Sequence, residues 1–91
     1  MNHSKDNKAD IDNLYEAVLK LDNKKAVADF FEDICTIKEL NTIAQRLEVA
    51  RLLKANTTFS EIEKQTGASS ATISRVNRAL QYGAGGYDLV L

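Results

Sequence analysis

The 91-residue sequence has no proline, no tryptophan, one cysteine and one histidine. The single Cys35 cannot form a disulfide within the chain, which favours a reducing cytoplasm. His3 lies in a polar end, so the sequence offers no zinc site and no histidine for acid–base catalysis. No stretch has the length of a membrane span, and residues 1–10 lack the apolar run of a signal peptide. We therefore expect a cytoplasmic protein that is not an enzyme, with no catalytic residues, no metal and no required cofactor.

The apolar residues recur at helical spacing, and nothing in their pattern predicts a strand. The length and the 44% hydrophobic content are typical of one small globular domain. We predict a flexible tail over residues 1–10 and one all-α domain over residues 11–91. Helices are expected near residues 11–21, 24–34 and 36–54, the last opening with a Thr36–Glu39 capping box, and a short helix or docking segment at 87–91.

Residues 59–81 have the pattern of a helix-turn-helix. Ser60 and Glu63 fit a capping box at the start of the first helix. Gly67 can take the left-handed conformation that ends it. Either Ser69 or Ser70 can cap the second helix.

The second of these helices has an apolar side and a side of small polar and cationic residues. Ile62 and Thr66 of the first helix are expected to face inward. Small residues at the front of a helix and arginines behind them suit entry into the DNA major groove. Two helices joined by a glycine turn also occur in proteins that never contact DNA, but an outer face that met only water would more often carry Glu and Lys. The apolar side is Ile73, Val76 and Leu80, and the open side is Ser70, Ala71, Ser74, Arg75 and Arg78.

The charges are unevenly placed, although the net charge is only −1. In residues 1–36, five lysines stand against eight acidic residues, a net charge of −3. In residues 37–82, seven Lys and Arg stand against four acidic residues, a net charge of +3, and all four arginines lie there. The positive charge therefore accompanies the predicted helix-turn-helix, as binding to phosphates requires.

From residue 36 to residue 80 the chain resembles the tryptophan repressor superfamily, and in particular a small branch found in Gram-positive bacteria. The matching segments are Thr-Ile-Lys-Glu-Leu-Asn-Thr-Ile-Ala-Gln-Arg-Leu (36–47), Leu-Leu-Lys (52–54) and Thr-Gly-Ala-Ser-Ser-Ala-Thr-Ile-Ser-Arg (66–75). The most specific part is the core Gly-Ala-x-x-Ala-Thr-Ile-(Ser/Thr)-Arg. The similarity continues over residues 82–91, so it covers most of the chain beyond residue 10.

The resemblance implies an all-α fold in which two chains intertwine and present two helix-turn-helix units to a pseudo-palindromic DNA operator. By position, Ser70, Ala71 and Ser74 fall where the family places its base-facing residues. The residues expected at the DNA backbone are Gln45, Arg46 and Arg78, and Ser60 is a further candidate. Arg75 lies on the same open side of the second helix as Arg78 and is also expected to contact DNA.

Four positions correspond to residues that surround the amino acid in tryptophan-binding members: Thr36, Arg46, Thr72 and Arg75. Two arginines there would flank the aromatic ring of the ligand, and one of them would hold the ligand's carboxylate. Thr36 is better explained as a helix cap, and Arg75 also fits DNA contact. Val76 stands where the family has a glycine and Ala79 where it has a serine, so tryptophan is not the expected effector.

The sequence thus predicts a homodimeric, sequence-specific DNA-binding regulator, a repressor, that binds double-stranded DNA and no membrane, with an effector of unknown identity if any. The alternative is a non-catalytic protein–protein interaction module that uses the same helix-turn-helix surface. The modest net charge and the apolar C-terminal end keep this alternative open. Binding to a protein would change little with salt, whereas binding to DNA would weaken steeply.

Overall fold

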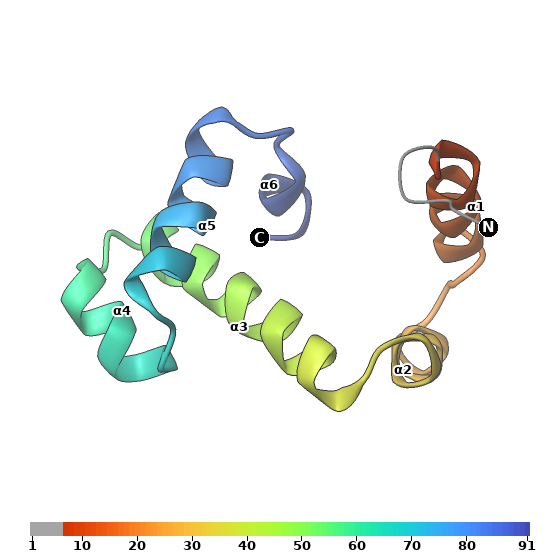
Figure 1. The fold of residues 1–91 in the computed structure, drawn as a ribbon, viewed down its shortest axis with the longest axis horizontal. Helices are drawn as coiled ribbons and strands as arrows, with labels where there is room; N and C mark the ends of the chain where they lie inside the picture. Colours follow the sequence, from red (N-terminus) through yellow and green to blue (C-terminus); the bar gives the residue numbers. More distant parts are fainter. Residues whose placement is uncertain (1–6) are drawn as a thin grey trace. The chain divides into compact units, whose positions relative to one another are not determined.

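The computed structural model describes residues 7–91, and every regular element in that part of the chain is a helix (Figure 1). None of these helices is long and apolar enough to cross a membrane. The predicted all-α class is confirmed. The elements are α1 (Lys8–Val18), α2 (Lys24–Ile34), α3 (Ile37–Lys54), α4 (Phe59–Thr66), α5 (Ser70–Tyr82) and α6 (Gly86–Val90).

The chain divides into two compact units, Met1–Thr36 with α1 and α2, and Ile37–Leu91 with α3 to α6. One domain was expected over residues 11–91. The first helix begins at Lys8 and ends at Val18, three residues earlier at each end than its apolar spacing predicts. Residues 8–10 of the predicted tail are therefore helical, and residues 1–6 lie outside the described residues.

The first unit has helices but no buried core in its described residues. Neither α1 nor α2 contains a buried residue. Asn23 caps α2, and its side-chain oxygen accepts a hydrogen bond from the Ala26 amide at 2.8 Å. Phe30 and Phe31 meet edge to face, with ring centroids 6.0 Å apart. Large apolar side chains stay exposed, including Tyr15 at 63% and Leu19 at 77% of their surface. Isolated short helices are marginal in water, so this unit needs a further apolar surface for stability.

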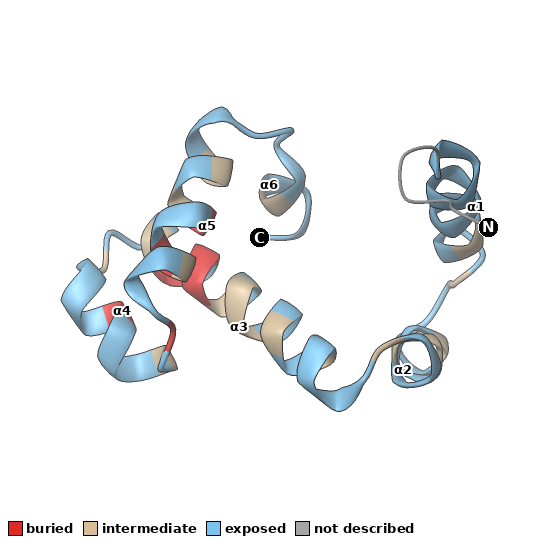
Figure 2. Cartoon of the chain, viewed as in Figure 1, coloured by how far each residue is buried: buried red, intermediate tan, exposed pale blue. Residues whose placement is uncertain are grey.

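The second unit is built around the C-terminal half of α3, where the buried residues gather (Figure 2). The helix-turn-helix packs on this half from both of its helices, as the inward-facing positions predict. Ile62 and Ile73 are fully buried, while Leu80 is half-buried at the edge of the cluster. The buried cluster is Val49, Ala50, Leu52, Ile62, Ala68, Ile73 and Val76.

The ends of α4 and α5 are fixed by local hydrogen bonds. Gly67 ends α4 in the left-handed conformation (φ 72°), and Ser69 caps α5 by accepting a hydrogen bond from the Thr72 amide at 3.2 Å; both predictions are confirmed. The predicted Ser60–Glu63 capping box is wrong. Thr58 is the cap of α4 and accepts from the Glu61 amide at 3.2 Å, because the helix begins one residue before Ser60.

Replacing Ile62 by alanine removes a fully buried side chain from between α3 and α5. We expect a loss of about 2–5 kcal/mol in the free energy of unfolding, measured by urea denaturation followed by circular dichroism. The matched control is Glu63→Ala on the next, exposed position, which should change stability by less than about 0.5 kcal/mol. Equal effects of the two substitutions would contradict the packing described here.

Candidate nucleic-acid interface

The open side of α5 carries small polar and cationic side chains, and the opposite side of the helix is buried. Ile73 and Val76 anchor the helix in the core. This anchoring turns the opposite side of α5 to solvent, and the helix places short side chains in its first turns and arginines in the later ones. All five residues predicted for this side are exposed: Ser70, Ala71, Ser74, Arg75 and Arg78.

The turn between α4 and α5 is held by Thr66 and Gln45. The Thr66 hydroxyl donates to the Ile62 carbonyl at 2.7 Å and accepts from the Ala68 amide at 3.1 Å. From α3, Gln45 Nε2 donates to the Thr66 carbonyl at 3.1 Å. Gln45 was predicted at the DNA backbone, and the structure gives its amide nitrogen this partner within the fold. The bond ties the turn to α3, which limits how far the two helices can tilt.

The other predicted residues lie in different surroundings. Ser60 is exposed in the first turn of α4. Thr72 is half-buried and its hydroxyl accepts from the Ser69 hydroxyl at 3.1 Å. Thr36 directly precedes α3, at the end of the first unit. Arg46 is half-buried on α3, and its Nε is buried without a hydrogen-bond partner among the described residues.

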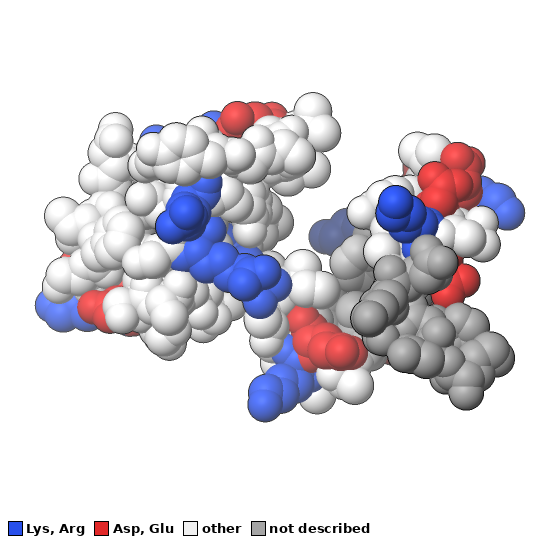
Figure 3. Space-filling model, turned by 45° about the horizontal axis from the view of Figure 1, so that its top comes forward, with Lys and Arg blue, Asp and Glu red and all other residues white. Residues whose placement is uncertain are grey.

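The cations of the second unit divide into paired and unpaired groups. Arg51 donates to Glu48 on the same helix, with 2.9 Å from Nε to Oε1, and this bond holds the pKa of the exposed Glu48 carboxyl below its ordinary value. Lys54 pairs with Asp88. Within residues 7–91, Arg75 and Arg78 form no ion pair, so their charge is available to a ligand. Figure 3 shows Lys and Arg side chains together on the visible face of this unit.

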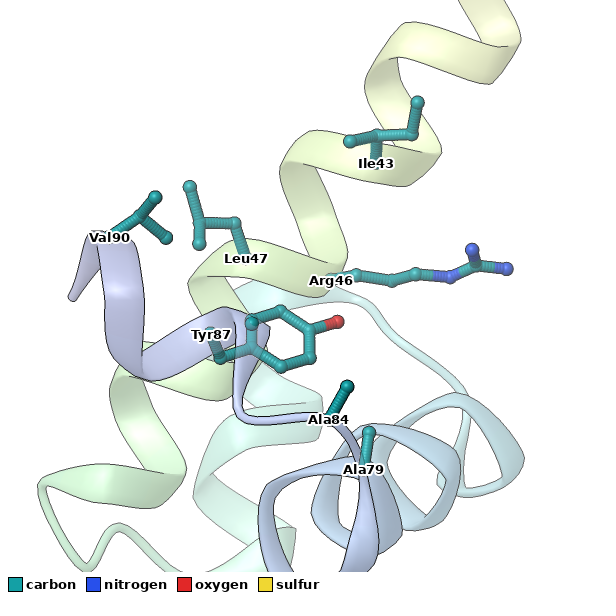
Figure 4. Close-up of a pocket in the computed structure, with 8 residues that line it drawn as sticks. Ile43, Arg46, Leu47, Ala79, Ala84, Tyr87 and Val90 are labelled. Atoms are coloured by element: carbon teal, nitrogen blue, oxygen red, sulfur yellow. The ribbon is translucent and has the colours of Figure 1, made fainter. Parts of the chain in front are cut away.

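A pocket of about 460 Å³ lies between α3, the end of α5 and α6 (Figure 4). Arg46 is the one charged side chain that lines the pocket, and Ala79 forms the wall on the α5 side. Of the four residues predicted for an effector pocket, Arg46 is the one that lines this space. Val76 is buried in the core and does not line this pocket. The lining residues are Ile43, Arg46, Leu47, Ala79, Ala84, Gly86, Tyr87 and Val90.

The contribution of the C-terminal residues to this pocket was missed by sequence reasoning. Tyr87 packs against the buried cluster, and Val90 lines the pocket beside it. The available signal was an aromatic and an apolar residue three apart, directly after a glycine-rich link. That spacing predicts a short helix, which α6 confirms, but it does not say which surface the helix covers.

Comparison with known proteins places the chain among relatives of the same fold. The family model described as Trp repressor protein matches residues 9–91. The uncharacterized protein YerC of Bacillus subtilis is 48% identical over 82 residues, which are 90% of this chain and 79% of YerC.

Two crystal structures superpose over nearly the whole chain. One is of a candidate Trp repressor from Staphylococcus aureus, with 43% identity, a TM-score of 0.86 and coverage of 100% of this chain and 91% of that one. The other is of a TrpR-like protein from Eubacterium eligens, with 47% identity, a TM-score of 0.85 and coverage of 98% and 91%.

Gln45→Ala removes the donor that holds the Thr66 carbonyl. We expect the free energy of unfolding to fall by about 0.5–1.5 kcal/mol in urea denaturation, the usual net value of such a bond. Asn41→Ala, at an exposed position of the same helix, is the control and should leave stability nearly unchanged. If both variants match the wild type, the bond does not stabilise the turn.

Proposed function

Because the chain belongs to the Trp repressor family, a family of DNA-binding regulators rather than enzymes, we propose that it is a sequence-specific DNA-binding repressor that acts as a homodimer in the cytoplasm. The observation that carries the proposal is the exposed side of α5. It joins small side chains to unpaired arginines on a helix that the core holds in place. On this proposal the protein represses by occupying an operator and excluding other proteins from it.

The roles of the individual residues follow from size and charge. Ser70, Ala71 and Ser74 are short enough to let the helix approach base edges in the major groove. Arg75 and Arg78 supply charge beside them and bind phosphates or a guanine edge. Ser60, at the exposed start of α4, adds a phosphate contact.

Gln45 and Arg46 act from α3. The hydrogen bond of Gln45 to Thr66 supports a role for Gln45 in setting the angle of the turn. Arg46 is half-buried at the pocket, where its guanidinium group can bind either a DNA phosphate or a small anion. We propose no obligatory cofactor. Tryptophan is a poor candidate effector, because Val76 and Ala79 stand where the tryptophan-binding members have a glycine and a serine.

The homodimer is proposed from the surface that the first unit leaves uncovered. Neither helix has a fully buried residue in the single chain, yet both have apolar sides. A second copy that packs on these sides would supply the missing core and would set two recognition helices at a fixed spacing along the DNA. The exposed apolar residues of this unit include Ile11, Leu14, Tyr15, Val18, Leu19, Val27 and Ile34.

Arg75→Ala and Arg78→Ala should each weaken binding to an operator by about 1–3 kcal/mol where the contact is specific. The operator is first obtained by selection of genomic fragments with the wild-type protein, and affinities are then measured by fluorescence anisotropy. Lys20→Ala removes the same charge from the first unit and serves as the control. Unchanged affinity in the folded double variant would contradict the proposal.

The salt dependence separates DNA binding from protein docking. Release of counterions from DNA should make the logarithm of the affinity fall linearly and steeply with the logarithm of the salt concentration. Each arginine that contacts a phosphate should reduce this slope by about one when it is removed. If the wild-type protein captures no DNA at low salt, the protein-interaction module becomes the better hypothesis.

Leu14→Lys should disrupt the proposed dimer, because it replaces an apolar side chain of α1 by a charged one. A second copy of the chain would cover this position and so bury the charge. Light scattering should give twice the chain mass of 10.1 kDa for the wild type and less for the variant. Asp12→Lys introduces the same side chain at a polar, exposed position of α1 and is the control. A wild-type mass of a single chain would exclude the homodimer.

A further inference from the structure

The C-terminal segment, defined here as residues 83–91, packs against α3 instead of extending from α5 (Figure 1). Two contacts hold it there. Tyr87 packs against the buried cluster, and Asp88 pairs with Lys54 at the end of α3. Both contacts lie in the second unit, which also contains α5.

The link between α5 and α6 is shaped for this return. A Cβ atom built on Gly83 would lie 2.5 Å from the carbonyl oxygen of Ala79, so only glycine fits this close approach to the last turn of α5. A Cβ on Gly86, three residues later, would meet nothing within 4 Å. Gly83 is the residue that ends α5, and its amide donates to the Ala79 carbonyl at 2.9 Å, so this glycine sets how the chain leaves the helix.

The last turns of α5 have few large contacts of their own. The core residues Ile73 and Val76 lie in its first two turns, whereas in the last turn Leu80 is half-buried against the cluster and Ala79 offers one methyl group to the pocket. Figure 4 shows the Tyr87 ring in the space bordered by Leu47 of α3 and by Ala79 and Ala84. The ring is thus the large side chain that spans the distance between α3 and the end of α5.

We propose that Tyr87 is a positioning residue for the recognition helix: the C-terminal segment inserts its ring between α3 and the end of α5 and so fixes the direction in which Arg78 meets DNA. Arg78 directly precedes Ala79, which borders the same pocket as the ring. Loss of the ring would remove one of the two large side chains near this end of α5 that pack against the buried cluster, and would leave Leu80. The inference rests on the proposed DNA-binding function and adds a residue that lies outside the predicted interface.

The test compares the full-length protein with Tyr87→Ala, Tyr87→Phe and Leu89→Ala, using the operator duplex selected by the wild type. We expect Tyr87→Ala to weaken operator binding by about five-fold or more, the usual lower range for coupling between sites. Tyr87→Phe should restore the affinity because it keeps the ring. Leu89→Ala, at a position of α6 that is 86% exposed, should bind like the wild type. A folded Tyr87→Ala variant with wild-type affinity overturns the proposal.

A second measurement separates positioning from a general loss of stability. Arg78→Ala should cost less affinity in the Tyr87→Ala background than in the wild type, because a misdirected arginine has little contact left to lose. Equal costs in the two backgrounds overturn the positioning role. If Tyr87→Ala does not fold, Tyr87→Leu, which keeps an apolar side chain but removes the ring, is used in its place with the same control. A folded Tyr87→Leu variant with wild-type operator affinity overturns the proposal.

Hydrogen exchange of the backbone amides gives a readout that does not need DNA. Tyr87→Ala, or Tyr87→Leu if the former does not fold, should speed exchange in the last turns of α5 relative to α4. If the wild type selects no DNA but this change is seen, the proposed function fails while the support of α5 by Tyr87 stands. If exchange in α5 is unchanged, Tyr87 does not support the helix, whatever the protein binds.

Discussion

The packing of Ile62 and Ile73 against the C-terminal half of α3 is the constraint on which the described interface depends. These side chains are fully buried, so α4 and α5 cannot rotate without exposing them to water, at a cost of about 1.5–3 kcal/mol for each. The side of α5 opposite Ile73 is thereby turned outward. The hydrogen bond from Gln45 to Thr66 adds directionality, which apolar contact lacks. Core packing and one polar bond together present the small residues and arginines of α5 as one surface.

The two units differ in how much apolar surface a single chain can bury. The second unit buries seven residues in its own cluster, and its helix ends are capped by Thr58 and Ser69. The first unit has well-defined helices, yet its apolar side chains remain exposed. Helix formation is a local property, whereas burial requires a partner surface. A homodimer would provide that surface and also the paired recognition helices that a two-fold operator requires.

The pocket beside α6 lies between α5 and the end of the chain. Its walls come from α3, α5 and α6, so these three helices border the same space. Arg46 lies at the same place, with a buried Nε that has no partner in the described part of the chain. Here the chain's own Tyr87 supplies an aromatic ring, which is the basis for our proposal that the C-terminal segment positions the recognition helix.

The sequence by itself determined the helices, the left-handed end of α4 at Gly67 and the division of α5 into a buried and an exposed side, because these depend on neighbours within a few residues. It misplaced the cap of α4, since Thr58 and Ser60 are both good caps and their relation to the core decides between them. Only the tertiary structure decided that Gln45 bonds to Thr66 and that Tyr87 lines the pocket with Arg46. These partners are separated by many residues along the chain, so no local pattern encodes their contact. The packing of α3 brings them together.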